Sequence, residues 1–392
     1  MLNDMWFETD EDASWRAEVR AFLAAELPPE EAFEVEYSED EARWEFAWDF
    51  SRRVAERGWI GLSWPTEYGG AGAPAAHQAI MLEEFAFHNA PLINNIGWSL
   101  AAGTLLSAGT DEQKARFLPP IADMTTLWAE GLTEPDAGSD LASLRTTARR
   151  DGDDWVINGQ KTYTTWGTRA DVLYLAARTD PDASRHRGIS IFCLDLHLPG
   201  ISFAPLMNIA GGRQNHTYLD DVRVGPDMLI GEEGRGWDAI MRSFYDTGPM
   251  VFPHAMHRRM LEEVTAWCGT QERDGRELLD DPSVRHALAE LAVIVECEEL
   301  LSRQSLGSFL RGRERDYAGA LEAVVYKESK PRFAQLVTDI VGPLAQLRVG
   351  ALGAPLDGEV PEWYLQSFGN HAGGTSQVKR MVLATRGLGL PR

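Results

Sequence analysis

The spacing of apolar residues changes twice along the chain, and this limits what its 392 residues can fold into. Before about residue 125 and after about residue 230, apolar residues recur every three or four positions, which predicts helices. Between these regions they come in short runs interrupted by glycine and proline, which predicts antiparallel strands. We therefore expect an α+β fold with an N-terminal α-helical domain over 1–125, a middle antiparallel β-barrel or sandwich over 126–230, and a C-terminal four-helix bundle over 231–392.

Two helical features are specific enough to be tested individually. The bundle is expected to form from four segments, near 236–270, 283–311, 317–347 and 361–386. In the N-terminal region, Thr110 and Gln113 have the spacing of a helix N-terminus, with Asp111 and Glu112 near the positive end of the helix dipole.

The middle region contains a compact run of strand and turn signals. Asp151–Asp154 separates two short strands, and Asn158-Gly159 is typical of a type I′ hairpin turn, because both residues tolerate positive φ. We therefore expect a turn at each place and a further strand over Gln160–Trp166.

The loop Leu132–Asp140 precedes these strands. Pro135 and Gly138 disfavour regular structure there, while short hydroxyl groups and free backbone N–H groups can hydrogen-bond the polar edge of a flat heterocycle. Taken alone, the loop is explained equally well as an ordinary surface turn. Together with the Gln160–Trp166 strand, it is expected to form two walls of one slot for a planar cofactor.

Composition and charge argue against several classes of function. Nucleic acid and anionic membrane surfaces would repel a net charge of −23, so neither is an expected partner. We expect no membrane span and no signal peptide, since no apolar run is long enough and the N-terminus is acidic. Cys193, Cys268 and Cys297 are widely spaced, and we expect small buried hydrophobic residues rather than disulfides or metal ligands, as suits a reducing cytoplasm. The chain has no Gly-x-Gly-x-x-Gly fingerprint, so a Rossmann domain is not expected.

Two segments of the middle region resemble the signatures of the acyl-CoA dehydrogenase flavoproteins. They are Thr-Glu-Pro-Asp-Ala-Gly-Ser-Asp at 133–140, and Asn-Gly-Gln-Lys at 158–161 followed by Tyr163-Thr164-Thr165. The resemblance runs over nearly the whole chain, and Arg178–Asp182 and His186–Ser190 are most similar to bacterial steroid side-chain acyl-CoA dehydrogenase subunits. It implies FAD as cofactor, an acyl-CoA substrate, electron-transfer flavoprotein or a similar acceptor, and a hetero- or homotetramer with a related subunit.

The resemblance also implies which residues bind the cofactor. Thr133, Tyr163 and Thr165 would contact the isoalloxazine ring, with Tyr163 in a place where the family usually has Trp. Thr375 and Gln377 would contact the nucleotide part. The full expected set is Leu132, Thr133, Gly138, Ser139, Tyr163, Thr164, Thr165, Thr375 and Gln377.

The family's catalytic base is missing from both of its usual positions. Oxidising a thioester between its α and β carbons needs a carboxylate that removes the α proton and a flavin that accepts the β hydride. The resemblance places the base Glu at Thr247 or Gly373, and neither is acidic. The family's Arg-x-x-Phe-Gly run, which serves the FAD pyrophosphate of the partner subunit, is matched by Gln271–Gly275 and has no cation at its first position.

Four interpretations remain open. The chain is one subunit of an unlike pair that divides cofactor and base functions, or Asp246 acts as the base from a shifted helix. Alternatively the fold carries out flavin oxygenase chemistry, with His371 and His254 as candidate acid/base groups. The fourth interpretation is a non-catalytic subunit that completes a partner's site.

Overall fold

The computed structural model describes residues 5–28, 33, 40–209, 212–246, 252–312, 317–369 and 371–391. The chain divides into two compact units, which we describe separately. The first comprises Met1–Ala25, Ala79–Ala90 and Val251–Arg392, and the second comprises Glu26–Gln78 and Pro91–Met250.

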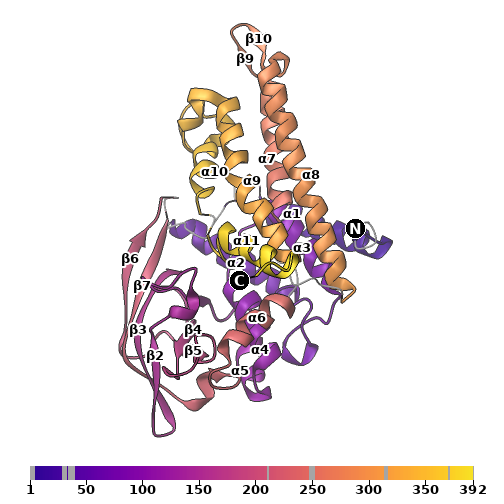
Figure 1. Cartoon of the computed structure of the whole chain (residues 1–392). Coiled ribbons are helices and arrows are strands. Elements are labelled where there is room, and N and C mark those ends of the chain that lie inside the picture. The colour runs from indigo at the N-terminus through magenta and orange to yellow at the C-terminus, as the bar shows by residue number, and fades with distance from the viewer. Residues whose placement is uncertain are drawn as a thin grey trace. The chain divides into compact units, whose positions relative to one another are not determined.

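The second unit is built around one sheet with strand order β6-β7-β3-β2-β4-β5-β8, and β1 pairs with β4 (Figure 1). The β1–β4 and β2–β4 pairs are parallel, while the other described pairs of this sheet are antiparallel. The strands are β1 (Trp128–Gly131), β2 (Thr147–Asp151), β3 (Asp154–Thr165), β4 (Val172–Arg178), β5 (Ile189–Asp195), β6 (Ile201–Met207), β7 (Arg213–Val224) and β8 (Leu229–Ile230).

Helices of the second unit precede and follow the sheet in sequence. They are α2 (Glu41–Glu56), the π-helix η4 (Ile96–Ala101), α4 (Ala102–Ala108), α5 (Asp111–Ala122) and α6 (Gly236–Asp246), with short 3-10 turns at Thr66–Tyr68, Leu141–Ser143 and Pro226–Met228. The predicted N-terminus of α5 is confirmed: the Gln113 N–H donates to Thr110 Oγ1 at 3.2 Å, and the Thr110 N–H donates to Gln113 Oε1 at 3.0 Å. The Gln113 amide also donates to the carbonyl oxygens of Asp227 and Leu229, which ties the start of α5 to β8.

The core of the sheet is formed by apolar strands and large aromatic rings. All of β5 except its last residue is buried. The rings of Trp155 and Phe192 meet edge to face with centroids 5.5 Å apart, and Phe117 of α5 meets Trp128 in the same way at 5.8 Å. Each such side chain contributes roughly 2–3 kcal/mol through burial, so these contacts hold α5 and the strands together.

One of the two expected turns is correct and the other is wrong. The turn at Asp151–Asp154 forms, with Gly152 at φ +69°. Asn158-Gly159, by contrast, lies inside the continuous strand β3, which pairs with β2 on one side and β7 on the other. Gly159 serves a close approach of two backbones instead of a turn, because a Cβ there would lie 2.7 Å from the Cα of Thr146.

The first unit is helical. Its helices are α1 (Asp10–Glu26), α3 (Ala75–Phe87, which starts in the second unit), α7 (Pro253–Cys268), α8 (Pro282–Leu310), α9 (Ala318–Val341), α10 (Val360–Gln366) and α11 (Ser376–Val382), with the hairpin β9 (Glu272–Arg273) and β10 (Arg276–Glu277). Short 3-10 turns lie at Leu278–Asp280, Gly342–Gln346 and Pro355–Gly358, and a π-helix at Leu383–Gly387. Figure 1 shows α7, α8 and α9 as long helices that lie side by side. The order of helical, strand and helical regions is therefore as predicted. Two of the four expected bundle segments are each divided, however: that near 236–270 holds α6 and α7, and that near 361–386 holds α10 and α11.

The bundle core lies between α7, α8 and α9. Its fully buried residues include Val264, Leu291 and Val295, with Phe333 and Val337 from α9. Cys193 and Cys268 are buried as expected, but the prediction is wrong for Cys297, which is exposed on α8; all three thiols are free. None of the described helices is long and apolar enough to cross a membrane.

Candidate functional site

A buried ion pair fixes the loop that begins at Leu132. Lys161 Nζ lies 2.8 Å from Glu134 Oε1 and donates to the Leu132 carbonyl oxygen at 3.1 Å. Glu134 also accepts two backbone N–H groups, from Arg145 at Oε2 (2.6 Å) and from Thr146 at Oε1 (2.9 Å). The residues on both sides of Thr133 are therefore held in place by one lysine.

The electrostatics of this pair follow from its burial. Side-chain exposure is 0% for Lys161 and 7% for Glu134. Burial lowers the pKa of Lys161 to about 8, although the Glu134 charge opposes that change. Burial alone would raise the pKa of Glu134, but the Lys161 charge and the donors from Thr146 and Arg145 hold it below its usual value. Both groups are thus kept charged near neutral pH by each other.

The two signature segments meet at the end of β3. The Thr162 N–H donates to the Thr133 carbonyl oxygen at 2.9 Å. The Gln214 amide donates to Thr165 Oγ1 at 3.0 Å and to the Tyr163 carbonyl oxygen at 3.2 Å, which fixes the strand end. Tyr163 has φ +60° and a side chain that is 51% exposed. The register shift of β3 between Lys161 and Thr164 thus turns the tyrosine ring outward.

The other predicted cofactor-binding residues of the second unit differ in which of their groups a ligand could reach. Leu132 is buried, and the Thr164 hydroxyl is buried where it accepts from Thr217 Oγ1 at 2.9 Å, so only the backbones of these two are available to a ligand. Gly138 and Ser139 are exposed in the loop.

An unpaired donor lies next to Thr165. Trp166 Nε1 is buried and has no hydrogen-bond partner among the described residues. An orphaned buried N–H group of this kind costs free energy unless an acceptor reaches it. The end of β3 thus carries a buried N–H donor next to the Thr165 hydroxyl and close in sequence to the exposed Tyr163, which are groups that a flat ligand with acceptor atoms such as FAD requires.

The expected residues of the first unit lie on and before α11. Thr375 caps this helix, since its Oγ1 accepts the Val378 N–H at 3.2 Å. Gln377 is exposed. Because Thr375 and Gln377 belong to the other unit, their relation to Thr133 stays a prediction.

No carboxyl group is described at the family's base positions. Gly373 has φ +67°, and a Cβ there would meet no atom within 4 Å. Thr247 and Gly248 lie outside the described residues, and Asp246 is the last residue of α6. Of the two histidines considered for an oxygenase, His371 is exposed.

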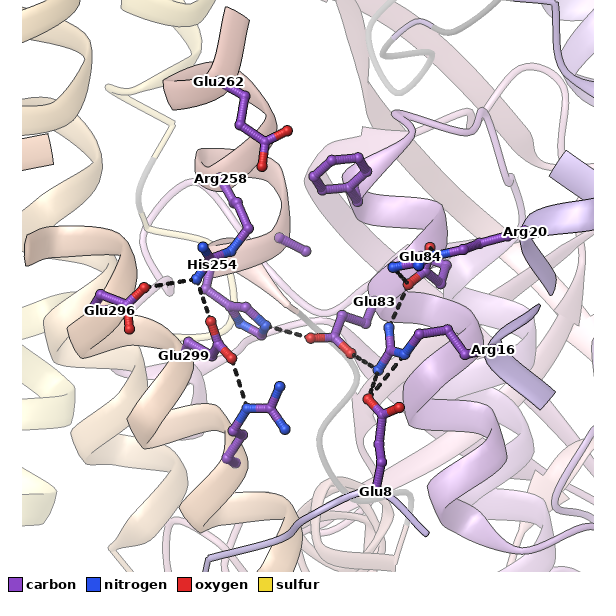
Figure 2. Close-up of a pocket in the computed structure, with 13 residues that line it drawn as sticks. Glu8, Arg16, Arg20, Glu83, Glu84, His254, Arg258, Glu262, Glu296 and Glu299 are labelled. Atoms are coloured by element: carbon purple, nitrogen blue, oxygen red, sulfur yellow. Dashed lines mark hydrogen bonds and ion pairs between the residues drawn. The ribbon is translucent and has the colours of Figure 1, made fainter. Parts of the chain in front are cut away.

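The other histidine, His254, lines a charged cavity of about 590 Å³ in the first unit (Figure 2). Helices α1, α3, α7 and α8 and the segment before α1 contribute its lining, which contains four arginines and six glutamates: Arg16, Arg20, Arg258, Arg303, Glu8, Glu83, Glu84, Glu262, Glu296 and Glu299. His254 Nε2 lies 2.7 Å from Glu83 Oε1. This histidine therefore belongs to an ion-pair network.

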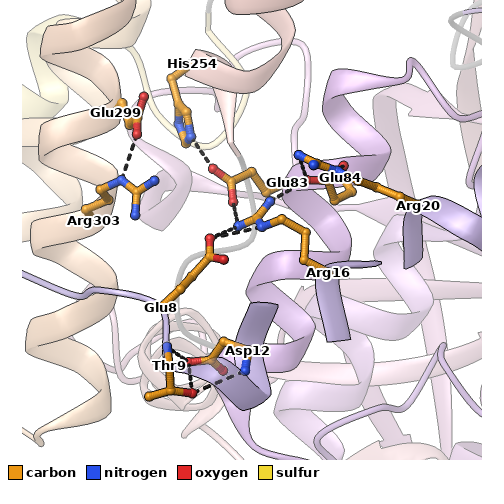
Figure 3. Close-up of polar contacts among 10 residues, drawn as sticks. All are labelled: Glu8, Thr9, Asp12, Arg16, Arg20, Glu83, Glu84, His254, Glu299 and Arg303. Carbon is orange, nitrogen blue, oxygen red and sulfur yellow. Dashed lines mark hydrogen bonds and ion pairs between the residues drawn. The ribbon is translucent and has the colours of Figure 1, made fainter. Parts of the chain in front are cut away.

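Figure 3 shows how the network is connected. Arg16 contacts Glu8, Glu83 and Glu84 at 2.5 to 2.6 Å. Burial alone would raise the pKa of Glu83, but hydrogen bonds and charges from His254 and Arg16 lower it to about 2. These contacts join α1, α3, α7 and α8, which indicates that the network stabilises the packing of the four helices.

One carboxyl group near the loop, that of Glu130, is not among the residues predicted from the sequence. Glu130 lies on β1, two residues before Leu132, and its Cα pairs with that of Tyr174. It makes no hydrogen bond or ion pair with any of the described residues, and burial raises its pKa to about 7. The Tyr174 hydroxyl, whose pKa is raised by burial, lies 2.8 Å from Thr104 Oγ1. The only sequence signal was an acidic residue inside an apolar run.

Comparison with known proteins agrees with this arrangement. The family models for the N-terminal, middle and C-terminal domains of acyl-CoA dehydrogenases match residues 9–125, 129–222 and 234–388. The chain is 35% identical to the acyl-CoA dehydrogenase FadE29 of Mycobacterium tuberculosis over 98% of both chains.

Two solved structures are also similar to the chain. The ChsE4-ChsE5 complex of Mycobacterium tuberculosis is 32% identical, with a TM-score of 0.90 over 98% of this chain and 99% of that one. The Tcur3481-Tcur3483 steroid ACAD is 31% identical, with a TM-score of 0.88 over 98% and 99%. Members of the matched family are FAD-binding oxidoreductases, and FAD is the cofactor. By these matches, the chain belongs to the acyl-CoA dehydrogenase family.

Proposed function

We propose that this chain is one subunit of an FAD-dependent acyl-CoA dehydrogenase that forms a double bond between the α and β carbons of a bulky, steroid-derived CoA thioester. The observation that carries the proposal is the difference between the flavin-binding residues, which are present, and the catalytic base, which is not. The flavin-side loop keeps its hydroxyl groups and its anchoring lysine, while Gly373 stands where the family has a Glu base. The name of the similar ChsE4-ChsE5 complex gives two subunits, and the other similar structure is called a steroid ACAD, which supports an unlike pair and a steroid-derived substrate.

The proposed roles follow from what each side chain presents. FAD supplies the hydride acceptor when it is bound. Thr133 and Thr165 would hydrogen-bond its flat ring, and Tyr163 would cover that ring. Lys161 keeps Thr133 in position, because it holds Leu132 and Glu134 on either side.

The base is expected to come from the related partner subunit. Gly373 has a left-handed backbone, which costs other residues about 1–2 kcal/mol, so this loop conformation favours glycine over an acid. Two carboxyl groups of this chain are the alternatives: Asp246 at the end of α6, and Glu130, whose pKa of about 7 suits proton exchange at neutral pH.

Electrons must then leave the reduced site. We expect electron-transfer flavoprotein or a similar acceptor to take them. The expected assembly is a tetramer with the related subunit.

The test compares the full chain alone with the chain co-expressed with its candidate partner, the related product of a neighbouring gene. Flavin absorbance and native mass are measured first, followed by dye reduction with a steroid side-chain CoA thioester and with a straight-chain one. We expect flavin, a heterotetramer mass and dye reduction only with the partner, and faster reduction with the steroid thioester. An active homotetramer would overturn the unlike pair, and NAD(P)H-driven oxygen consumption without thioester oxidation would overturn the dehydrogenase.

Point variants test the site itself. Thr133→Ala should weaken flavin binding about tenfold, the usual effect of losing one hydrogen bond of about 1.4 kcal/mol. Thr168→Ala, an exposed threonine just after β3, is the matched control and should change nothing. Glu130→Gln and Asp246→Asn should retain activity if the partner supplies the base, whereas a loss of more than hundredfold in either would move the base into this chain.

A further inference from the structure

Three ionisable side chains form a row across neighbouring strands of the sheet unit. They are Glu130 on β1, Tyr174 on β4 and Cys193 on β5. The Cα of Tyr174 pairs with that of Glu130 on one side and with that of Cys193 on the other. Directly paired residues point to the same face of a sheet, so the three side chains share one face. The Tyr174 hydroxyl lies 2.8 Å from Thr104 Oγ1, which shows that α4 reaches this face.

Glu130 differs from its neighbours in exposure and in bonding. Trp128 and Leu132 share its face of β1 and are 0% and 7% exposed, and Tyr174 beside it is 0% exposed. Glu130 is the one member of this group that is partly exposed. Its carboxyl group makes no hydrogen bond or ion pair with the described residues, whereas the Tyr174 hydroxyl is bonded. The fold therefore leaves space beside a carboxyl group that has no partner.

This space lies close to the expected flavin site. Glu130 is three residues before Thr133, which is expected to contact the isoalloxazine ring. An extended chain rises about 3.3 Å per residue, so the Cα atoms of these two residues are at most about 10 Å apart. A fused-ring acyl group spans such a distance. A substrate whose α and β carbons meet the flavin can thus place a remote part of its acyl group at Glu130.

The π-helix η4 packs against the same strand. Asn94, which has φ +66°, lies just before η4 and ties it to β1: its buried amide accepts the Trp128 N–H and donates to the Thr126 carbonyl oxygen, both at 2.9 Å. Residues Gly97 and Ala101 add little side-chain volume to η4. Because π-helices are rare and occur frequently at functional sites, η4 supports a ligand-binding role for the space beside β1.

We propose that Glu130 selects an acyl group that carries a hydroxyl or keto oxygen remote from the thioester. This inference rests on the proposed function, because it concerns the substrate of that reaction. A protonated carboxyl group donates a hydrogen bond to a keto oxygen, and an ionised one accepts a hydrogen bond from a hydroxyl group. Burial raises the pKa of Glu130 to about 7, so both forms are present near neutral pH. An acyl group without such an oxygen would leave the carboxyl group unpaired and shielded from water, which disfavours its binding.

The experiment measures binding before turnover, on the full chain assembled with its partner. The probes are CoA thioesters of α,β-unsaturated cholanic acids, which are products of the proposed reaction and are therefore not consumed. One has no ring oxygen, and the others carry one hydroxyl group on ring A, B or C. Calorimetry should show that the parent binds at least one hydroxylated thioester about tenfold more tightly than the unsubstituted one, the effect of one hydrogen bond.

Variants of Glu130 test whether this residue causes the preference. Glu130→Leu should remove it, and Glu130→Gln, whose amide still donates and accepts, should keep most of it. Glu45→Leu, at an exposed glutamate on α2, is the matched control and should bind as the parent does. Thermal unfolding verifies that each variant is folded.

Three results would overturn the proposal. They are a parent without any preference, an equal loss of affinity for all the thioesters in Glu130→Leu, and a loss of bound FAD in that variant, which would place the residue at the cofactor instead. Dye reduction with the corresponding saturated thioesters is then measured. Oxidation without a preference that depends on Glu130 would count against this inference alone, whereas such a preference in binding without oxidation would count against the proposed function alone.

Discussion

The Lys161–Glu134 pair of the sheet unit and the Arg16 network of the helical unit both stabilise charges that are shielded from water, but with different numbers of counter-ions. The pair is almost completely buried and each of its charges has a single counter-ion, whereas Arg16 contacts three carboxylates around a cavity of about 590 Å³. A buried charge that loses its sole counter-ion has no replacement, while a network member leaves its neighbours with other partners. Positioning of the loop therefore depends on one residue, and packing of the four helices depends on many.

The largest effect is expected for Lys161→Met. This variant leaves the Glu134 carboxylate buried without its counter-ion, which should destabilise the protein by about 3–5 kcal/mol. Denaturant unfolding measures the loss, and Lys114→Met is the control. A loss below about 1 kcal/mol would mean that the two backbone donors to Glu134 suffice, and the contrast between the regions would disappear.

Glu83 of the network is expected to show an intermediate effect that depends on pH. Its pKa is lowered to about 2, so the stabilisation is fully present above the usual carboxyl pKa near 4.5 and is lost as pH falls toward 2. Glu83→Gln should lose roughly 2–3 kcal/mol at neutral pH and show less destabilisation on acidification than the parent. Unfolding measured from pH 6 to pH 3 tests this, and equal pH dependence in both proteins would contradict it.

The smallest effect is expected for an exposed pair. Arg116 and Asp227 lie 2.6 Å apart, but both side chains are more than half exposed. Arg116→Ala should change stability by about 0.5 kcal/mol or less, because solvent screens such pairs. A loss of unfolding free energy comparable to that of Glu83→Gln would show that burial does not determine how much these three ion pairs stabilise the protein.

Much of the fold could be predicted because local signals and tertiary structure agree. The Thr110–Gln113 cap forms where its spacing predicts, and the short apolar runs between about residues 125 and 230 form strands. The turn predicted at Asn158-Gly159 is wrong because Asn-Gly is compatible both with a hairpin turn and with a strand that another backbone approaches closely. Only the approach of Thr146 to Gly159 decides between them, and that contact is tertiary.

The candidate site was predicted less completely than the fold. The motifs indicated Thr133, Tyr163 and Thr165, and the structure joins their two segments through the Thr162 to Thr133 hydrogen bond. The sequence motif contains Lys161 but does not indicate its role, because the burial that pairs it with Glu134 is set by tertiary structure. Glu130 could not be recognised, because its raised pKa comes from burial, which depends on elements distant in sequence.

The scarcity of lysine has a practical consequence for chemical labelling. Of five side-chain amines, Lys161 is sealed inside the sheet unit, so an amine-acylating reagent has few places to react. Lys327, with its pKa of about 8, is partly uncharged in mildly alkaline buffer and is therefore nucleophilic there. Mass spectrometry of the modified peptides would thus report on the surroundings of Lys327 without any engineered probe.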